Sequence, residues 1–466
     1  MNISSIQQDA ASGPARGSRP IRRLGAVAAC IAVAVTASIS SAGTAVADDG
    51  TATVSRGVAV PAFYDPPQSL PATNGALVRT EPMRLGISLP GLAGPLPGTA
   101  TRVMFRSTDA NGAPVAVTGA YIEPAARWSG PGPRPLVVQA SGTMGQGDQC
   151  APSLALENPL SLNLRDSTIS ASVGYENIAT YRLLSQGIAV MATDYVGLGT
   201  TDRLHTYVSR LDQGHAVLDA VRAARAVPGA SVSPTSKVGL YGYSQGGGAA
   251  ASAAELAPTY APELTIAGAY VGAPPADLLK VIDGIDGSAL AVALGWTING
   301  MAETRPSIKP ALDKYLNAKG QAMLKGAATQ CVGDGILAYA FTRTTSLTKL
   351  GISLSQVLDR EPALKQIVQE QRIGLSKPTT PVRIATGISD DTVPHGQVRQ
   401  LAVDWCRAGA AVTYEPILIP DLGQKVVLTN HFIPLITDQT AAISWIRARL
   451  DGRPATSNCA ALPILP

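Results

Sequence analysis

Short apolar runs alternate with longer amphipathic stretches over much of the chain, and this alternation predicts the secondary structure. Five almost wholly apolar runs predict buried strands at residues 136–140, 187–193, 238–241, 266–272 and 382–388. Stretches with a helical period predict helices at residues 175–185, 211–226 and 397–408, and a last helix that ends near Leu450. Strands that alternate with helices in this way predict an α/β fold, with a mostly parallel central sheet covered by helices on both faces.

Two regions, residues 48–100 and 277–377, depart from this alternation of strands and helices. Residues 48–100 are rich in Pro, Gly and Ala, and they predict an extended arm with one short helix near residues 63–70. Residues 103–106 and 115–122 flank a turn and predict an antiparallel hairpin, and residues 412–419 predict a further strand.

Residues 277–377 show no clear strand pattern and form the second departure. Four helical stretches are predicted there, at residues 289–296, 307–325, 335–341 and 354–372. An insertion of this size between two strands is typical of a cap, which divides the mature chain into a first core part (48–276), a cap (277–377) and a second core part (378–466). Residues 289–296 are apolar nearly all round, which fits either a buried core helix or the wall of an acyl pocket.

The N-terminal residues 1–47 predict a cleaved signal peptide and hence a secreted protein. Four arginines precede an apolar run at residues 24–35, and the small residues that follow end in Ala45-Val46-Ala47. A membrane anchor is disfavoured because the run is short and polar residues follow it. Residues 27–30 resemble a lipidation box at Cys30, but the later cleavage site after Ala47 fits better.

Composition and cysteine content narrow the class further. The 466 residues are 45% hydrophobic and 15% charged, and the net charge of +4 is spread along the chain, which argues against nucleic-acid binding. Cleavage of the signal leaves four cysteines, and an even number in a secreted chain predicts two disulfides with three possible pairings. Their wide spacing, without paired histidines nearby, argues against a zinc site. The four are Cys150, Cys331, Cys406 and Cys459.

The candidate chemistry centres on residues 237–250, which contain the pattern Gly-x-Ser-x-Gly at 242–246. An apolar strand precedes the pattern and a run of very small residues follows it, which is the strand–turn–helix context of a serine nucleophile. The turn places Ser244 in a strained conformation, and the N-terminus of the helix after it favours an oxyanion. The alternative is a glycine-rich turn with an incidental serine, which the complete context disfavours.

A serine nucleophile needs a histidine base and a carboxylate that orients it. The chain has four histidines, of which His431 lies on a predicted loop between the last strand and the last helix, where this arrangement places its base. His205 follows the segment at Asp194 and is expected to shape the site, whereas His215 and His395 lie at predicted helix starts. Spacing leaves the acid open between Asp390 and Asp391, which both follow the strand at 382–388; Asp277 and Asp194 are lesser rivals.

A glycine-rich loop at residues 141–147 follows the first buried strand. In a serine enzyme of this architecture, such a loop carries the second oxyanion donor, besides the N–H of the residue after the nucleophile, here Gln245. A plain connecting loop is the alternative.

These motifs resemble those of the secretory lipases of the α/β-hydrolase superfamily, and the resemblance covers nearly the whole mature chain. The stretches that carry it are residues 150–153 (CAPS), 242–244 (GYS), 260–264 (YAPEL), 316–321 (LNAKGQ) and 390–394 (DDTVP). In the family's Asp-x-x-Val-Pro pattern the first position is the catalytic acid, which implies Asp390, and the family's base falls on His431.

The resemblance also implies disulfide pairing and one departure from the family. The family's two disulfides imply Cys150–Cys331 and Cys406–Cys459. In a yeast member an acidic residue makes the second oxyanion contact, and counting back from Cys150 places Met144 there, so that a backbone N–H of Met144 or Thr143 has to serve.

Together the residues predict a secreted serine hydrolase that cleaves carboxylic esters through an acyl-enzyme on Ser244. The substrate is expected to be a lipid or another small ester, with transient contact at a lipid interface, no stable protein partner and no metal or organic cofactor. An acyltransferase or a serine peptidase on the same fold is the alternative, because the fold hosts many reactions. A non-catalytic binding protein is disfavoured, since all three triad positions are occupied.

Overall fold

The structure is a computed structural model of the chain, and it describes residues 52–91, 95–165, 168–419, 427–464 and 466. The predicted signal peptide, residues 1–47 with Cys30, lies outside the described residues. None of the helices in the described part of the chain combines the length and the apolar character that crossing a membrane requires.

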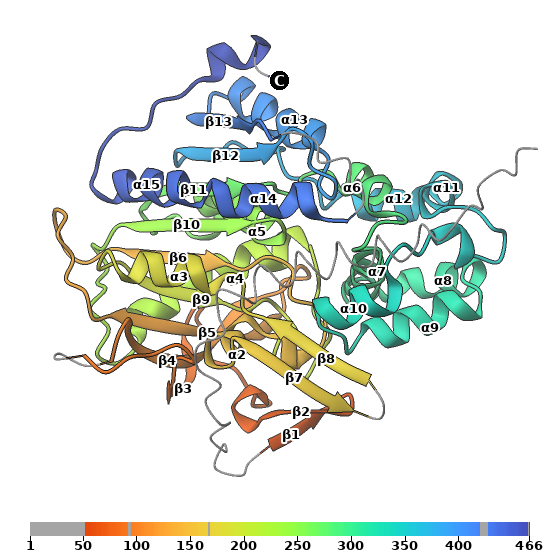
Figure 1. The fold of residues 1–466 in the computed structure, drawn as a ribbon, viewed down its shortest axis with the longest axis horizontal. Coiled ribbons are helices and arrows are strands. Elements are labelled where there is room, and N and C mark those ends of the chain that lie inside the picture. Colours follow the sequence, from red (N-terminus) through yellow and green to blue (C-terminus); the bar gives the residue numbers. More distant parts are fainter. Residues whose placement is uncertain (1–51, 92–94, 166–167, 420–426, 465) are drawn as a thin grey trace, which may run out of the picture. The chain divides into compact units, whose positions relative to one another are not determined.

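A nine-stranded sheet organises the fold, with strand order β13-β12-β11-β10-β6-β9-β5-β4-β3 (Figure 1). The strands from β13 to β9 are parallel to their neighbours, whereas β5, β4 and β3 pair antiparallel. The nine strands are β3 (Leu77–Met83), β4 (Gly98–Thr108), β5 (Pro114–Pro124), β6 (Leu136–Ala140), β9 (Ala189–Thr193), β10 (Val238–Tyr243), β11 (Ile266–Gly272), β12 (Val382–Gly387) and β13 (Val412–Ile417). The prediction of a mostly parallel sheet is therefore confirmed, and the hairpin predicted at residues 103–122 is β4–β5.

Helices cover both faces of this sheet. The helices α3 (Asn177–Leu184) and α15 (Gln439–Leu450) share one apolar core with strand residues such as Val137 and Tyr241. The helices α4 (Arg210–Ala226) and α5 (Gln245–Tyr260) pack against each other and against the sheet, and Figure 1 shows them behind it, with α15 in front. The helix α13 (His395–Arg407) contacts β12 and β13.

A helical segment lies between β11 and β12, where the sequence loses its strand pattern. Its helices are α6 (Leu278–Ile285), α7 (Val292–Thr304), α8 (Lys309–Tyr315), α9 (Ala318–Ala327), α10 (Val332–Tyr339), α11 (Leu354–Arg360) and α12 (Pro362–Gln369). Two stretches predicted as single helices are each broken in two. Asn317 caps α9 with its side chain, and Pro362 starts α12 because proline cannot continue the preceding helix.

The prediction of an extended arm at residues 48–100 is wrong in its second half. A small hairpin, β1 (Ala52–Ser55) and β2 (Val58–Pro61), precedes a short 3-10 helix, η1 (Ala62–Tyr64), and β3 then joins the central sheet as an edge strand. The residues of β3 are mostly half-exposed and include Pro82, so the strand lacks the apolar run by which buried strands are recognised. A second separate hairpin, β7 (Leu160–Arg165) and β8 (Thr168–Val173), was also not predicted.

The C-terminal part contains two helices where one was predicted, α14 (Thr429–Thr437) and α15. The structure contains both disulfides with the pairing that the family resemblance implies. Cys150, in η2 (Asp148–Cys150), is joined to Cys331 at the start of α10, and Cys406 in α13 is joined to Cys459 in η5 (Cys459–Ile464). The short helix α2 (Pro152–Glu157) follows η2. The first disulfide therefore ties the helical segment to the loop after β6.

Candidate active site

Ser244 occupies a sharp turn between β10 and α5. Its backbone has φ +57° and ψ −124°, a strained conformation for a residue with a side chain, and its N–H donates to the Gly272 carbonyl at 2.9 Å. A Cβ on Gly242 would lie 2.0 Å from the Gly246 oxygen, and a Cβ on Gly246 would lie 2.0 Å from the Ala140 oxygen. Only glycine fits at both positions, which explains the Gly-x-Ser-x-Gly spacing.

A hydrogen-bonded chain connects the serine, a histidine and an aspartate. The Ser244 Oγ lies 2.9 Å from His431 Nε2, and His431 Nδ1 lies 2.7 Å from Asp390 Oδ2. Both the histidine and the aspartate side chains are almost fully buried. With Nδ1–H donating to the carboxylate, Nε2 is free to accept the serine proton, which is the arrangement of a nucleophile, a base and an orienting acid.

Further hydrogen bonds hold the histidine and the aspartate in place. The Tyr243 hydroxyl donates to the His431 carbonyl at 2.8 Å, and Asp390 Oδ1 accepts the N–H groups of Thr392 and Val393 at 2.9 and 2.8 Å. The prediction that His431 lies on a loop is wrong, because it lies in the first turn of α14. Leu428 precedes this helix in the left-handed conformation, with φ +68°, and so aims the first turn at the serine.

Asp391 lies beside the same histidine but contacts a different atom. Its Oδ1 accepts the His431 backbone N–H at 3.2 Å, and its buried Oδ2 has no hydrogen-bond partner among the described residues. Burial raises the pKa of Asp391, against the opposing influence of His431. Burial also lowers the pKa of His431, but the charge and hydrogen bond of Asp390 and the charge of Asp391 outweigh it, so that the His431 pKa lies above its ordinary value.

The loop after β6 is held by three side chains that sequence reasoning missed. Tyr175 donates from its hydroxyl to the Thr143 carbonyl at 3.1 Å, and the Tyr207 hydroxyl lies 2.7 Å from Thr143 Oγ1. Glu176 accepts the Gly142 N–H at 2.9 Å, and burial raises the Glu176 pKa to about 7. These residues have no motif of their own, and only their position next to the loop reveals them.

The candidate oxyanion donors differ in what surrounds them. The N–H groups of Thr143, Met144 and Gln245 have no hydrogen-bond acceptor within the described chain, and Thr143 and Gln245 line cavities at Ser244. The Met144 side chain lines a different cavity, which does not include Ser244, and its carbonyl accepts the Val332 N–H.

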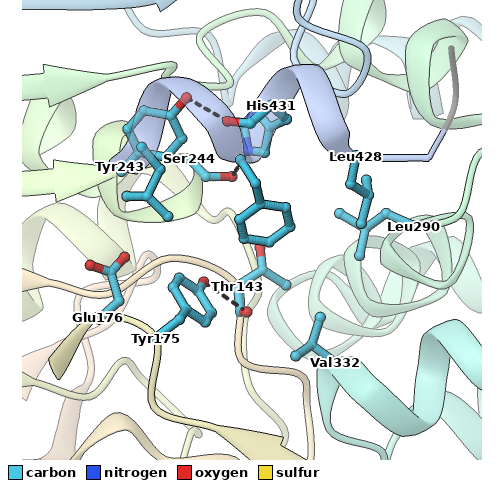
Figure 2. A pocket seen from close by; sticks show the side chains of 11 residues that line it. Thr143, Tyr175, Glu176, Tyr243, Ser244, Leu290, Val332, Leu428 and His431 are labelled. Carbon is cyan, nitrogen blue, oxygen red and sulfur yellow. Dashed lines mark hydrogen bonds between the residues drawn. The ribbon is translucent and has the colours of Figure 1, made fainter. Parts of the chain in front are cut away.

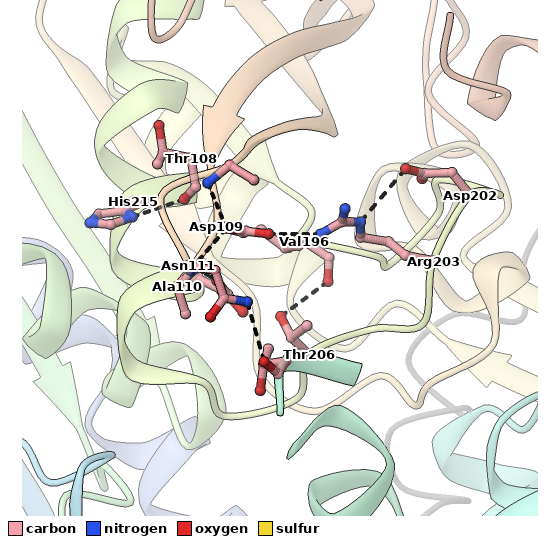
Figure 3. Close-up of polar contacts among 12 residues, drawn as sticks. Thr108, Asp109, Ala110, Asn111, Val196, Asp202, Arg203, Thr206 and His215 are labelled. Carbon is pink, nitrogen blue, oxygen red and sulfur yellow. Dashed lines mark hydrogen bonds and ion pairs between the residues drawn. The ribbon is translucent and has the colours of Figure 1, made fainter. Parts of the chain in front are cut away.

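His205 contacts the residue after the nucleophile. Its Nε2 lies 3.0 Å from the Gln245 side-chain nitrogen and its Nδ1 lies 3.1 Å from the Val196 carbonyl, so that Nδ1–H donates and Nε2 accepts. Burial lowers the His205 pKa to about 4, which keeps the ring neutral. Its loop is anchored by Arg203, which pairs with Asp109 at 3.2 Å in the β4–β5 turn (Figure 3).

The rival histidines lie elsewhere. His215 Nδ1 lies 2.9 Å from the Thr108 carbonyl (Figure 3). The His215 ring stacks on Tyr260 at 3.8 Å. His395 Nε2 lies 2.6 Å from the Tyr414 hydroxyl. Both are therefore engaged in local packing rather than in the chain at Ser244.

The rival carboxylates are likewise engaged elsewhere. Asp277 caps α6 by accepting the Leu279 N–H, and Asp194 is buried with the hydroxyl groups of Ser153 and Thr118 donating to it. Burial raises the Asp194 pKa to about 6. Of the candidate acids, Asp390 alone contacts the imidazole.

Two cavities meet at Ser244, and both are mostly apolar. We call the first, of about 380 Å³, the histidine-side cavity, and Figure 2 shows Tyr175 and Glu176 on one side of it and Leu290 and Leu428 on the other. It is lined by Thr143, Tyr175, Glu176, His431, Phe432 and Leu435, among others. We call the second, of about 450 Å³, the glutamine-side cavity, and Gln245, Val281, Ile282, Leu294 and Thr297 contribute to its wall.

A third cavity, of about 710 Å³, lies among the helices between β11 and β12. It shares Ile282, Leu294 and Thr297 with the glutamine-side cavity, and its lining is almost entirely aliphatic. Leu290 and Leu294 from the stretch at residues 289–296 line cavities, whereas Trp296 is fully buried and its indole N–H donates to the Ala327 carbonyl. Within residues 289–296, the interpretation as a cavity wall therefore applies to the two leucines, and the interpretation as a buried core helix applies to the tryptophan.

The sheet, with a serine at the turn after β10, an acid after β12 and a histidine after β13, defines an α/β-hydrolase fold. The chain belongs to the secretory lipase family, whose model matches residues 162–458, and it is thereby a carboxylic ester hydrolase of the lipase type. The predicted fold class and family are both confirmed.

Relatives and solved structures agree with this family. A Mycobacterium tuberculosis protein named a probable inactive lipase is 28% identical over 85% of this chain and 83% of its own length. Lipase 2 of Candida albicans is 28% identical over 85% of this chain and 82% of its own. The closed state of Candida antarctica lipase A superposes with a TM-score of 0.68 at 22% identity, over 85% of this chain and 87% of that chain, and therefore shows the fold.

Proposed function

We propose that the protein cleaves carboxylic esters with Ser244 as nucleophile, His431 as base and Asp390 as the acid that orients the base. The observation that carries this proposal is the hydrogen-bonded chain at 2.9 and 2.7 Å. Ser244 attacks the ester carbonyl while Nε2 takes its proton, and the imidazolium then passes this proton to the leaving alcohol. Water attacks the acyl-enzyme in the same way and releases the acid.

We propose the N–H groups of Gln245 and Thr143 as the oxyanion donors. Each is without an acceptor among the described residues, and each belongs to a residue that lines a cavity at the nucleophile. Donors aimed at a developing oxyanion are worth about 3 kcal/mol each. Met144, whose N–H is likewise without an acceptor among the described residues, is the alternative to Thr143, although its side chain lines a cavity that does not include Ser244.

Residues 277–377 are proposed to form a cap that holds the acyl part of a lipid ester. Leu290 and Leu294 from this segment line the glutamine-side cavity at Ser244, and this cavity shares three residues with the aliphatic cavity among the cap helices. A pocket of this kind buries a long apolar chain and offers it few polar groups.

Secretion is part of the proposal, supported by the name of the family and by the sequence of residues 1–47. The mature protein should begin near Asp48 and therefore lack Cys30, the residue that a lipoprotein would carry as its lipid-modified N-terminus. N-terminal sequencing of the exported protein tests this, and a lipid-modified cysteine would contradict it.

The test of function is hydrolysis of p-nitrophenyl octanoate by the wild type and by Ser244→Ala. The variant should fold and lose activity by several orders of magnitude, because no other group forms the acyl-enzyme. Ser252→Ala is the matched control: this buried serine of α5 bonds only to groups outside the cavities, and its loss should change turnover by less than about twofold. One relative is named a probable inactive lipase, so the activity of the wild type is measured first, and a wild type without ester hydrolysis would refute the proposal.

Chromogenic peptides and added alcohols separate ester hydrolysis from the alternative reactions. A peptidase would cleave the peptides at a rate comparable to that for the ester, and an acyltransferase would form a new ester with the alcohol faster than it forms free acid.

If Ser244→Ala hydrolyses p-nitrophenyl octanoate at a rate within about tenfold of the wild type, the assignment of Ser244 as nucleophile is refuted.

A further inference from the structure

The two cavities at Ser244 differ in which catalytic group they expose. His431 lines the histidine-side cavity, whereas the residues that line the glutamine-side cavity do not include it. In the proposed reaction the proton on Nε2 has to reach the oxygen of the leaving alcohol, and general acid catalysis requires that oxygen within about 3 Å of Nε2. The alcohol half of the ester therefore has to leave on the side of the histidine.

The acyl half stays bonded to Ser244 and needs space on the other side. The glutamine-side cavity offers this space, because Ile282, Leu294 and Thr297 join it to the large aliphatic cavity of the helical segment. The position of the His431 imidazole thus assigns the alcohol half to the histidine-side cavity and the acyl half to the glutamine-side cavity.

The wall of the histidine-side cavity fits a compact and uncharged alcohol. Tyr175 and Phe432 meet edge to face at 5.8 Å, and Leu435 and Val332 add aliphatic surface. Apolar and aromatic walls of this kind bind an apolar body and leave a charged group without hydration.

Glu176 gives this cavity a negative charge when its carboxyl group is ionised. Its carboxyl group accepts the Gly142 N–H and receives a long contact of 3.5 Å from the Gln139 side chain. It forms no ion pair with any described residue, and the cavity lining contains no lysine or arginine. A carboxylate that is buried without a cation repels a second anion strongly, because the surroundings screen it poorly.

We propose that the histidine-side cavity is the leaving-group site, that it takes the alcohol half of the substrate, and that Glu176 makes it discriminate against anionic alcohols. This inference rests on the proposed function and names the class of ester: one whose alcohol is compact and neutral, with the long apolar chain on the acyl side.

The charge test uses three octanoate esters that share their acyl group, those of phenol, 3-carboxyphenol and 3-(trimethylammonio)phenol. We measure kcat/KM at about pH 8.5, where Glu176 with its pKa of about 7 is ionised, and divide each value by the rate of hydroxide hydrolysis of the same ester. The wild type should disfavour the carboxyphenyl ester by at least about tenfold. Glu176→Gln keeps an oxygen for the Gly142 N–H and should reduce this discrimination to within about threefold.

The steric test uses the same substitution on each side of the serine. Val332→Phe narrows the histidine-side cavity and should lower kcat/KM for naphthyl esters by at least about tenfold more than it does for methyl esters. Val281→Phe narrows the glutamine-side cavity and should instead penalise long acyl chains, whatever the alcohol. Where a phenylalanine lowers the melting temperature, Leu435→Ala and Leu294→Ala enlarge the same two cavities and should show the converse preferences.

The outcomes separate this inference from the proposed function. If Ser244→Ala stays active, the proposed function fails. If Ser244→Ala is inactive but Val332→Phe changes acyl-chain preference, or Glu176→Gln leaves the discrimination against the carboxyphenyl ester intact, the assignment of the leaving-group site is overturned while the nucleophile stands.

Discussion

Replacing each of the two neighbouring aspartates by asparagine tests the acid of the proposed triad. In Asp390→Asn the amide donates to His431 Nδ1 where the carboxylate accepted at 2.7 Å, which leaves the proton on Nε2 and no lone pair for the serine. The same change in a serine protease costs about 10⁴ in turnover, or about 5 kcal/mol of transition-state stabilisation. We expect a loss of this order.

Asp391→Asn should cost much less, because the amide oxygen can still accept the His431 backbone N–H that Asp391 accepts at 3.2 Å. Loss of a weak neutral hydrogen bond is worth about 1 kcal/mol, which corresponds to less than about tenfold in turnover. The structure therefore predicts a gap of about three orders of magnitude between two adjacent and chemically identical substitutions.

The assay is kcat for p-nitrophenyl octanoate, with circular dichroism and thermal melting of each variant as the control for folding. Covalent labelling of Ser244 by a phosphonate gives a second readout, since it follows nucleophile activation without turnover. If Asp391→Asn is the more damaging variant while both are folded, the assignment of Asp390 is wrong. Nearly silent effects of both would place the orienting acid elsewhere.

Three further predictions follow from the same geometry. The acid limb of kcat/KM should have its midpoint above the ordinary histidine pKa of about 6.5, because activity needs neutral His431 and the His431 pKa is raised. Asp391→Asn removes one of the charges that raise the His431 pKa and should move this limb to lower pH. A limb that does not move would contradict this cause. Loss of the Cys150–Cys331 disulfide, which spans 181 residues, should lower the free energy of unfolding in urea by about 5 kcal/mol on the chain-entropy model, against about 4 kcal/mol for the disulfide that spans 53. The reverse order would refute the entropic account. Gly246→Ala should abolish activity and lower the melting temperature, since its Cβ would lie 2.0 Å from a backbone oxygen of β6; a fully active variant would show that α5 can move.

Much of the fold follows from local pattern. The strands β6 and β11 lie where their apolar runs predict them, and both are buried or nearly so along their length. The signal for the proposed nucleophile is equally local, because the strand, the glycine spacing and the small-residue helix are all contiguous around Ser244. Burial on both faces gives a central strand a signal that needs no knowledge of its neighbours.

Features that depend on distant partners could not be obtained in this way. The edge strand β3 is half-exposed and so lacks an apolar run. Spacing alone leaves the two aspartates after β12 equivalent, and only the family pattern favoured Asp390 before the structure placed its carboxylate at Nδ1. Glu176 belongs to no motif, and only the packing of α3 beside the loop after β6 brings its carboxyl group to the Gly142 N–H.

The sequence by itself thus determined the α/β class, and it predicted the candidate serine, the candidate histidine and their order along the chain. The tertiary structure decided which carboxylate oxygen faces the His431 imidazole and which of the two cavities the imidazole lines. It also decided that the buried Glu176 carboxyl lies near the proposed nucleophile. The physical reason is that periodicity records the burial of each residue, whereas a hydrogen bond depends on the direction and distance between groups that the chain brings together from far apart.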